Sequence, residues 1–82
     1  MSKDYEKARE AALWMIEEID YSCELTYEDA LQYIEQKWGL TFEYDDEKNR
    51  ISPKVLRQFR KLNKGLSMEI YWNPRKQAWM RR

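Results

Sequence analysis

Apolar residues recur at helical spacing in two segments of the N-terminal half. In residues 3–20 they define one face, and the glutamates stay off that face, as on a helix that packs against a core. In residues 27–38 a second apolar stripe follows Thr26, which can cap a helix, and precedes Gly39, a residue type that commonly terminates one. The pattern predicts one helix in each segment.

A third helix is predicted over residues 53–64, because Ser52 can cap it, Pro53 suits its first position and Gly65 closes it. The apolar residues of this segment share one side: Val55, Leu56, Phe59 and Leu62. The other side carries basic residues without an acid among them: Lys54, Arg57, Arg60, Lys61 and Lys64. The segment therefore has one face for a core and one cationic face.

Elsewhere the alternation has the two-residue period of a strand. Residues 40–44 alternate apolar and polar positions, residues 45–49 form a polar turn, and Ile51 is placed to close a hairpin with the first strand. Residues 68–72 and 77–81 form a second hairpin, joined by a turn that contains Asn and Pro. The expected order is helix, helix, strand, helix, strand, strand, which is an α+β fold of three helices with a small antiparallel sheet.

Length and composition bound what such a chain can be. Eighty-two residues are expected to form one domain, and 15% aromatic residues are enough for a packed core. The longest apolar run, Ala11–Ile16, is far too short to span a membrane. The first residues lack the apolar core of a signal peptide, and the single Cys23 excludes an internal disulfide, so we expect a cytoplasmic protein.

The net charge of zero conceals a strong asymmetry along the chain. Residues 1–49 hold five Lys or Arg and fourteen Asp or Glu, a net charge of −9. Residues 50–82 hold ten Lys or Arg and one acid, Glu69, a net charge of +9. Such asymmetry indicates a polyanionic or acidic partner. The alternative is that the two halves neutralise one another within the fold.

The inventory of reactive side chains argues against an enzyme. The chain has no histidine, which removes the most frequent general base and metal ligand. The lone Cys23 cannot build a thiolate zinc site and is expected to be a small buried side chain. Both glycines are explained by helix ends, so no phosphate-binding glycine loop is present. No catalytic residue, metal or cofactor is expected.

The positive signal is the basic face of residues 53–64 together with the last hairpin. Arg and Lys on a docked helix can neutralise DNA phosphates, and Arg can also read guanine in the major groove. The expected nucleic-acid contacts are Lys54, Arg57, Arg60, Lys61, Lys64, Arg75, Lys76 and Arg81. The aromatic residues Tyr71, Trp72 and Trp79 can stack bases, but at alternating strand positions such residues usually belong to a core.

Trp14 lies away from the apolar face of its predicted helix, where a charged residue usually stands. A side chain of this size is rarely left in water, because burying it is worth about 2–3 kcal/mol. Either the C-terminal strands cover it, or a second copy of the chain does. The second alternative predicts a twofold homodimer with Leu13 and Trp14 near its axis.

The helical N-terminal half, the basic third helix and the terminal two-stranded ribbon together resemble the winged-helix variety of the helix-turn-helix fold. This resemblance implies that residues 53–64 enter the major groove and that the ribbon 67–81 touches the flanking backbone. One departure is the connection of thirteen residues, 39–51, where a helix-turn-helix has three or four. The strand 40–44 must therefore join the sheet of the wing or form a hairpin of its own.

Three short stretches also resemble a family of small uncharacterised bacterial, phage and integron-cassette proteins: 11–15, 55–60 and 79–82. That resemblance implies no activity. Our leading hypothesis is a protein that binds nucleic acid, with duplex DNA as the expected form. The alternatives are an accessory factor whose basic face binds an acidic protein, and a DNA mimic that works through its acidic half.

Overall fold

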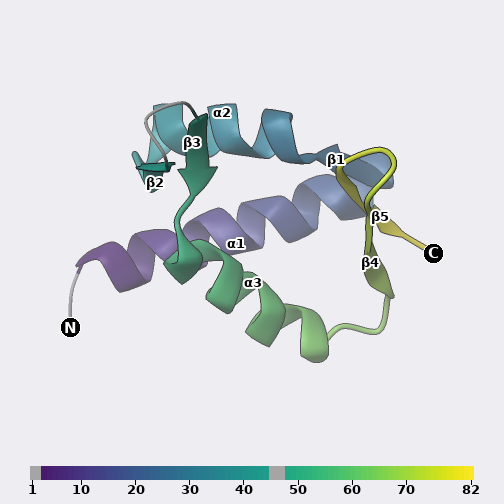
Figure 1. Cartoon of the computed structure of the whole chain (residues 1–82). Coiled ribbons are helices and arrows are strands. Elements are labelled where there is room, and N and C mark those ends of the chain that lie inside the picture. Colours follow the sequence, from purple (N-terminus) through teal and green to yellow (C-terminus); the bar gives the residue numbers. More distant parts are fainter. Residues whose placement is uncertain (1–2, 45–47) are drawn as a thin grey trace.

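The computed structural model describes residues 3–44 and 48–82 and has the expected α+β architecture (Figure 1). Its elements in chain order are α1 (Lys3–Ser22), β1 (Glu24–Thr26), α2 (Tyr27–Lys37), β2 (Thr41–Tyr44), β3 (Lys48–Ile51), α3 (Pro53–Lys64), β4 (Ile70–Asn73) and β5 (Ala78–Arg81). The predicted fold class and the three helices are confirmed. Part of the predicted polar turn, residues 45–47, lies outside the described residues.

The predicted signals fix both ends of α2. The backbone N–H of Asp29 donates to Thr26 Oγ1 at 3.2 Å, which satisfies one of the free donors of the first turn. At the other end Gly39 has φ +67°, and its N–H donates to the carbonyl of Ile34 at 3.0 Å. This left-handed residue ends the helix and turns the chain toward β2.

The predicted limits of α3 are confirmed in the same way. The side chain of Ser52 accepts a hydrogen bond from the backbone N–H of Lys54 at 3.3 Å, and Pro53 opens the helix. Gly65 follows the last turn, and its N–H donates to the carbonyl of Leu62 at 3.1 Å.

The terminal hairpin gains a third strand that the sequence pattern did not predict. The sheet has the order β1-β5-β4 and is antiparallel throughout, with Leu25 of β1 opposite Trp79 of β5. Strand β1 is only three residues long, too short for an alternating pattern to be recognised. The long connection between α2 and α3 forms its own hairpin, β2-β3, in which Thr41 lies opposite Ile51.

One apolar cluster joins the helices to both sheets. The largest fully buried side chains are Met15, Ile19, Ile34, Ile51 and Val55, so α1, α2, β3 and α3 all contribute. Helix α1 packs along α3 through small residues, since Ala8, Ala11 and Ala12 are completely buried. Small side chains let two helices approach closely, and this approach fixes the orientation of α3. Within the described residues, no helix is long and apolar enough to cross a membrane.

Candidate nucleic-acid interface

The five basic residues of α3 share one exposed face, as predicted from their spacing. Successive helical positions are about 100° apart, so these residues span an arc of about 120° around the helix axis. All five side chains are exposed: Lys54, Arg57, Arg60, Lys61 and Lys64. The opposite side of α3 is anchored by Val55 and Phe59, both buried. The helix is therefore held by its apolar side with its cations directed to solvent.

Most of these charges have no acidic partner in the part of the chain that the structure describes. Arg57, Arg60, Lys61 and Lys64 make no ion pair with any described residue. Among the described residues, these four charges of the α3 face therefore have no acid within ion-pair distance. We call Lys54 and these four residues the α3 basic face.

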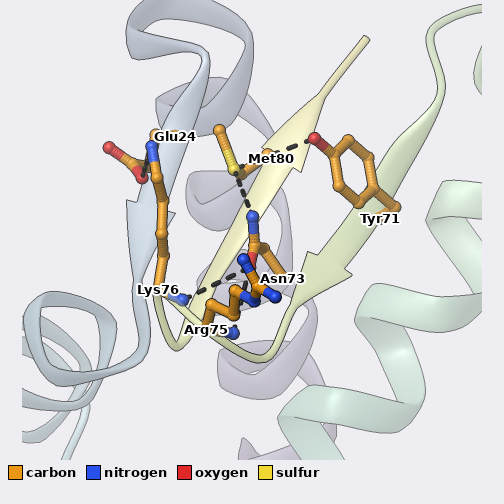
Figure 2. Close-up of polar contacts among 6 residues, drawn as sticks. All are labelled: Glu24, Tyr71, Asn73, Arg75, Lys76 and Met80. Atoms are coloured by element: carbon orange, nitrogen blue, oxygen red, sulfur yellow. Dashed lines mark hydrogen bonds and ion pairs between the residues drawn. The ribbon is translucent and has the colours of Figure 1, made fainter.

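The basic residues of the ribbon lie in a different environment. Lys76 Nζ is 3.6 Å from Glu24 Oε1 of β1, so this charge is shared with the acidic half (Figure 2). The turn itself is held by Asn73 Oδ1, which accepts hydrogen bonds from the backbone N–H of Arg75 at 3.0 Å and of Lys76 at 3.3 Å. Arg75 is exposed and makes no ion pair with a described residue. The carbonyl of Gln77 accepts the N–H of Tyr27 at 2.8 Å, which docks the turn at the start of α2.

Arg81 is also tied to the acidic half. Its Nη1 is 3.6 Å from Asp20 Oδ1, and its backbone N–H donates to the carbonyl of Cys23 at 3.3 Å. The neighbouring Cys23 side chain, and after it the Asp20 carboxylate, raise the pKa of the Arg81 guanidinium. The expected burial of Cys23 is wrong, because this residue occupies an exposed turn between α1 and β1 with φ +66°.

A cleft of about 210 Å³ lies between the start of α1 and the first turns of α3. Its lining comes from both helices: Tyr5, Ala8, Lys54, Arg57, Gln58 and Lys61. Sequence reasoning missed Gln58, which is only 6% exposed and is the one buried polar side chain among the described residues. A signal was present, because residues 54, 57, 58 and 61 have the i, i+3, i+4, i+7 spacing of one helix face.

A second groove of about 330 Å³ separates α3 from the ribbon. Arg60 and Asn63 line it from α3, and Tyr71 and Trp72 line it from β4. The buried Trp79 also lines it, and its ring centroid lies 5.7 Å from that of Phe59 and 4.9 Å from that of Trp72. Of the aromatic residues considered for base stacking, Trp79 therefore belongs to the core, whereas Trp72 is 39% exposed.

Trp14 finds its cover in α2, which neither sequence alternative had named. Its indole stacks on Tyr33 with a centroid distance of 4.1 Å and an interplanar angle of 6°, and Trp38 lies 6.3 Å away. Trp38 Nε1 in turn donates to Glu10 Oε2 at 3.2 Å. Leu13 is 39% exposed on the adjoining surface of α1. The half-buried Trp14 does not need a second chain to cover it, and the homodimer stays a prediction.

Comparison with protein families gives a match over most of the chain. The model of a family of unknown function, DUF6953, covers residues 7–81, which include most of α1, the other two helices and both hairpins. No curated protein and no solved structure matches the chain.

Proposed function

We propose that this chain, which belongs to the DUF6953 family of unknown function, binds duplex DNA through the α3 basic face. The observation that carries the proposal is the set of four cations that meet no acid among the described residues, Arg57, Arg60, Lys61 and Lys64. The ion pairs that described acids of the N-terminal half do make with the ribbon are those of Glu24 with Lys76 and of Asp20 with Arg81.

The proposed mechanism is electrostatic attraction followed by docking of a rigid helix. Each phosphate that is neutralised releases condensed counterions, which supplies affinity without sequence preference. An α-helix is about 10–12 Å across, which matches the roughly 12 Å width of the major groove of B-DNA. Val55 and Phe59 anchor the other side of α3, so the helix that carries the arginines is already ordered before DNA binds. Binding therefore does not incur the entropic cost of ordering it.

The winged-helix resemblance extends this proposal to the ribbon. In that arrangement α3 would lie in the major groove, and the turn around Arg75 would touch the flanking backbone. The ion pair of Lys76 with Glu24 and that of Arg81 with Asp20 lower the charge that the ribbon can offer to DNA. We therefore assign the main contribution to α3 and a smaller one to Arg75.

The first test is reversal of two charges at the centre of the α3 basic face. We expect Arg57→Glu with Arg60→Glu to abolish binding of a fluorescent duplex in an anisotropy titration at about 50 mM salt. Both side chains are exposed, so the melting temperature should stay close to that of the native chain.

The matched control is Lys7→Glu with Arg9→Glu, which makes the same change in net charge on an exposed part of α1. This control should keep most of the affinity. Equal binding by the α3 variant and the native chain would contradict the proposal. If the native chain does not bind DNA but binds an acidic protein, and the α3 variant loses that binding, the basic face serves a protein partner instead.

A further inference from the structure

The cleft between α1 and α3 has the composition of a site for an anionic group. Of the six described residues that line it, three are cationic, Lys54, Arg57 and Lys61, and none is acidic. All three cations come from the first three turns of α3. Cations alone, however, also occur on solvated helix surfaces that bind nothing.

Gln58 supplies the second and independent observation. This side chain is 94% buried by its neighbours, yet its amide makes no hydrogen bond to any residue that the structure describes. Its amide atoms are not fully enclosed, so the amide keeps contact with solvent although the residue as a whole is buried. The amide borders the cleft, so a group that enters the cleft can accept a hydrogen bond from it.

We propose that this cleft binds a single phosphate group, with Gln58 as a neutral hydrogen-bond donor and Arg57 and Lys61 as its charged partners. A volume of about 210 Å³ is smaller than the roughly 300–1,000 Å³ of sites that enclose a drug-sized ligand. The cleft therefore accommodates one group of a larger molecule. Phosphate is the anion that uses a mixed set of Arg, Lys and amide donors most fully, since it offers several strong acceptor oxygens.

The same chemistry has two sources, a backbone phosphate of DNA or the phosphate of a free nucleotide. In the first case the inference rests on the proposed function and assigns the cleft to one phosphate of the duplex. In the second case it stands alone. Gln58 is uncharged, so its contribution can be separated from general electrostatic attraction.

The direct test is a titration of the isotopically labelled full chain with inorganic phosphate at constant ionic strength, followed by nuclear magnetic resonance. We expect saturable shifts of the Gln58 side-chain amide and weaker or absent shifts at the exposed Gln36 of α2. Shifts that grow linearly without saturation, or equally at both glutamines, would mean an adventitious ion only and would overturn the proposal.

The deciding variant is Gln58→Leu, with Gln36→Leu as the matched control. We expect Gln58→Leu to bind phosphate about tenfold more weakly, because it removes one hydrogen bond to a charged group, and to melt close to the temperature of the native chain. Loss of binding without loss of stability separates a ligand-binding role from a structural one. Unchanged phosphate affinity in Gln58→Leu would overturn the proposal.

Duplex DNA distinguishes the two sources. Weaker DNA binding by Gln58→Leu, with an unchanged dependence on salt, assigns the cleft to a backbone phosphate. If Gln58→Leu binds DNA like the native chain but has lost phosphate binding, the cleft is assigned to a free phosphorylated ligand. If DNA does not bind at all but phosphate saturates the cleft, the proposed function fails and this inference stands. If DNA binds normally and Gln58 responds to neither ligand, the inference alone fails.

Discussion

The two glycines illustrate how differently one residue type acts at two helix ends. Gly39 has φ +67°, whereas Gly65, after α3, has φ −92°. A side chain at position 39 would have nothing within 4 Å, so backbone strain is the main cost of a substitution there. At position 65 a side chain would meet the carbonyl oxygen of Leu62 at an ordinary contact distance of 3.7 Å.

We predict that Gly39→Ala lowers the free energy of unfolding by about 1–2 kcal/mol, the usual cost of the left-handed conformation for a residue with a Cβ atom. Gly65→Ala is the control and should leave stability unchanged or raise it by about 0.4–1 kcal/mol, because it restricts the unfolded chain. Urea denaturation measures both. Equal losses in the two variants would mean that the left-handed conformation of Gly39 is not what distinguishes the two positions.

Gln58 marks the limit of sequence reasoning at the residue scale. A helical wheel places it at the border between the apolar and basic sides of residues 53–64, where a polar side chain is equally at home in solvent. Its burial depends on the packing of α1 against that border, which involves Tyr5 and Ala8. The sequence pattern of one helix contains no information on which neighbour covers its flank.

At the scale of elements, local signals predicted most of the fold. The caps Thr26 and Ser52 and the terminator Gly39 stand where the structure uses them. The one strand that was not predicted, β1, has no local signal, because its stability comes from pairing with β5, more than fifty residues later. The ion pairs of Lys76 and Arg81 were unpredictable for the same reason, since both acids lie in the N-terminal half.

These ion pairs lead to a prediction about the ribbon. Arg75→Glu with Lys76→Glu should weaken DNA binding by a smaller factor than Arg57→Glu with Arg60→Glu, although both double variants change the net charge equally. The reason is that Lys76 already shares its charge with Glu24 and that the turn is docked at the start of α2. Anisotropy titrations of the two variants under one salt condition give the comparison. A ribbon variant that loses as much affinity as the α3 variant would place the ribbon at the centre of the interface.

At the scale of the whole molecule, only some of the charges of the two halves form ion pairs with one another. The acidic half, with a net charge of −9, contacts the ribbon through Glu24 and Asp20. Helix α3 packs against α1 through buried apolar residues, and its basic face stays exposed. Charge of one sign is thereby concentrated on one helix, which is what attraction to a polyanion requires.

The salt dependence of DNA binding tests the central claim most directly. If the five residues of the α3 basic face each neutralise one phosphate, the logarithm of the binding constant should fall with the logarithm of salt concentration with a slope of about −4.5. Fluorescence anisotropy of a labelled duplex between about 50 and 200 mM salt measures this slope. A slope near zero, or no binding at about 50 mM salt with protein in the tens of micromolar, would contradict the assignment of the α3 basic face to DNA.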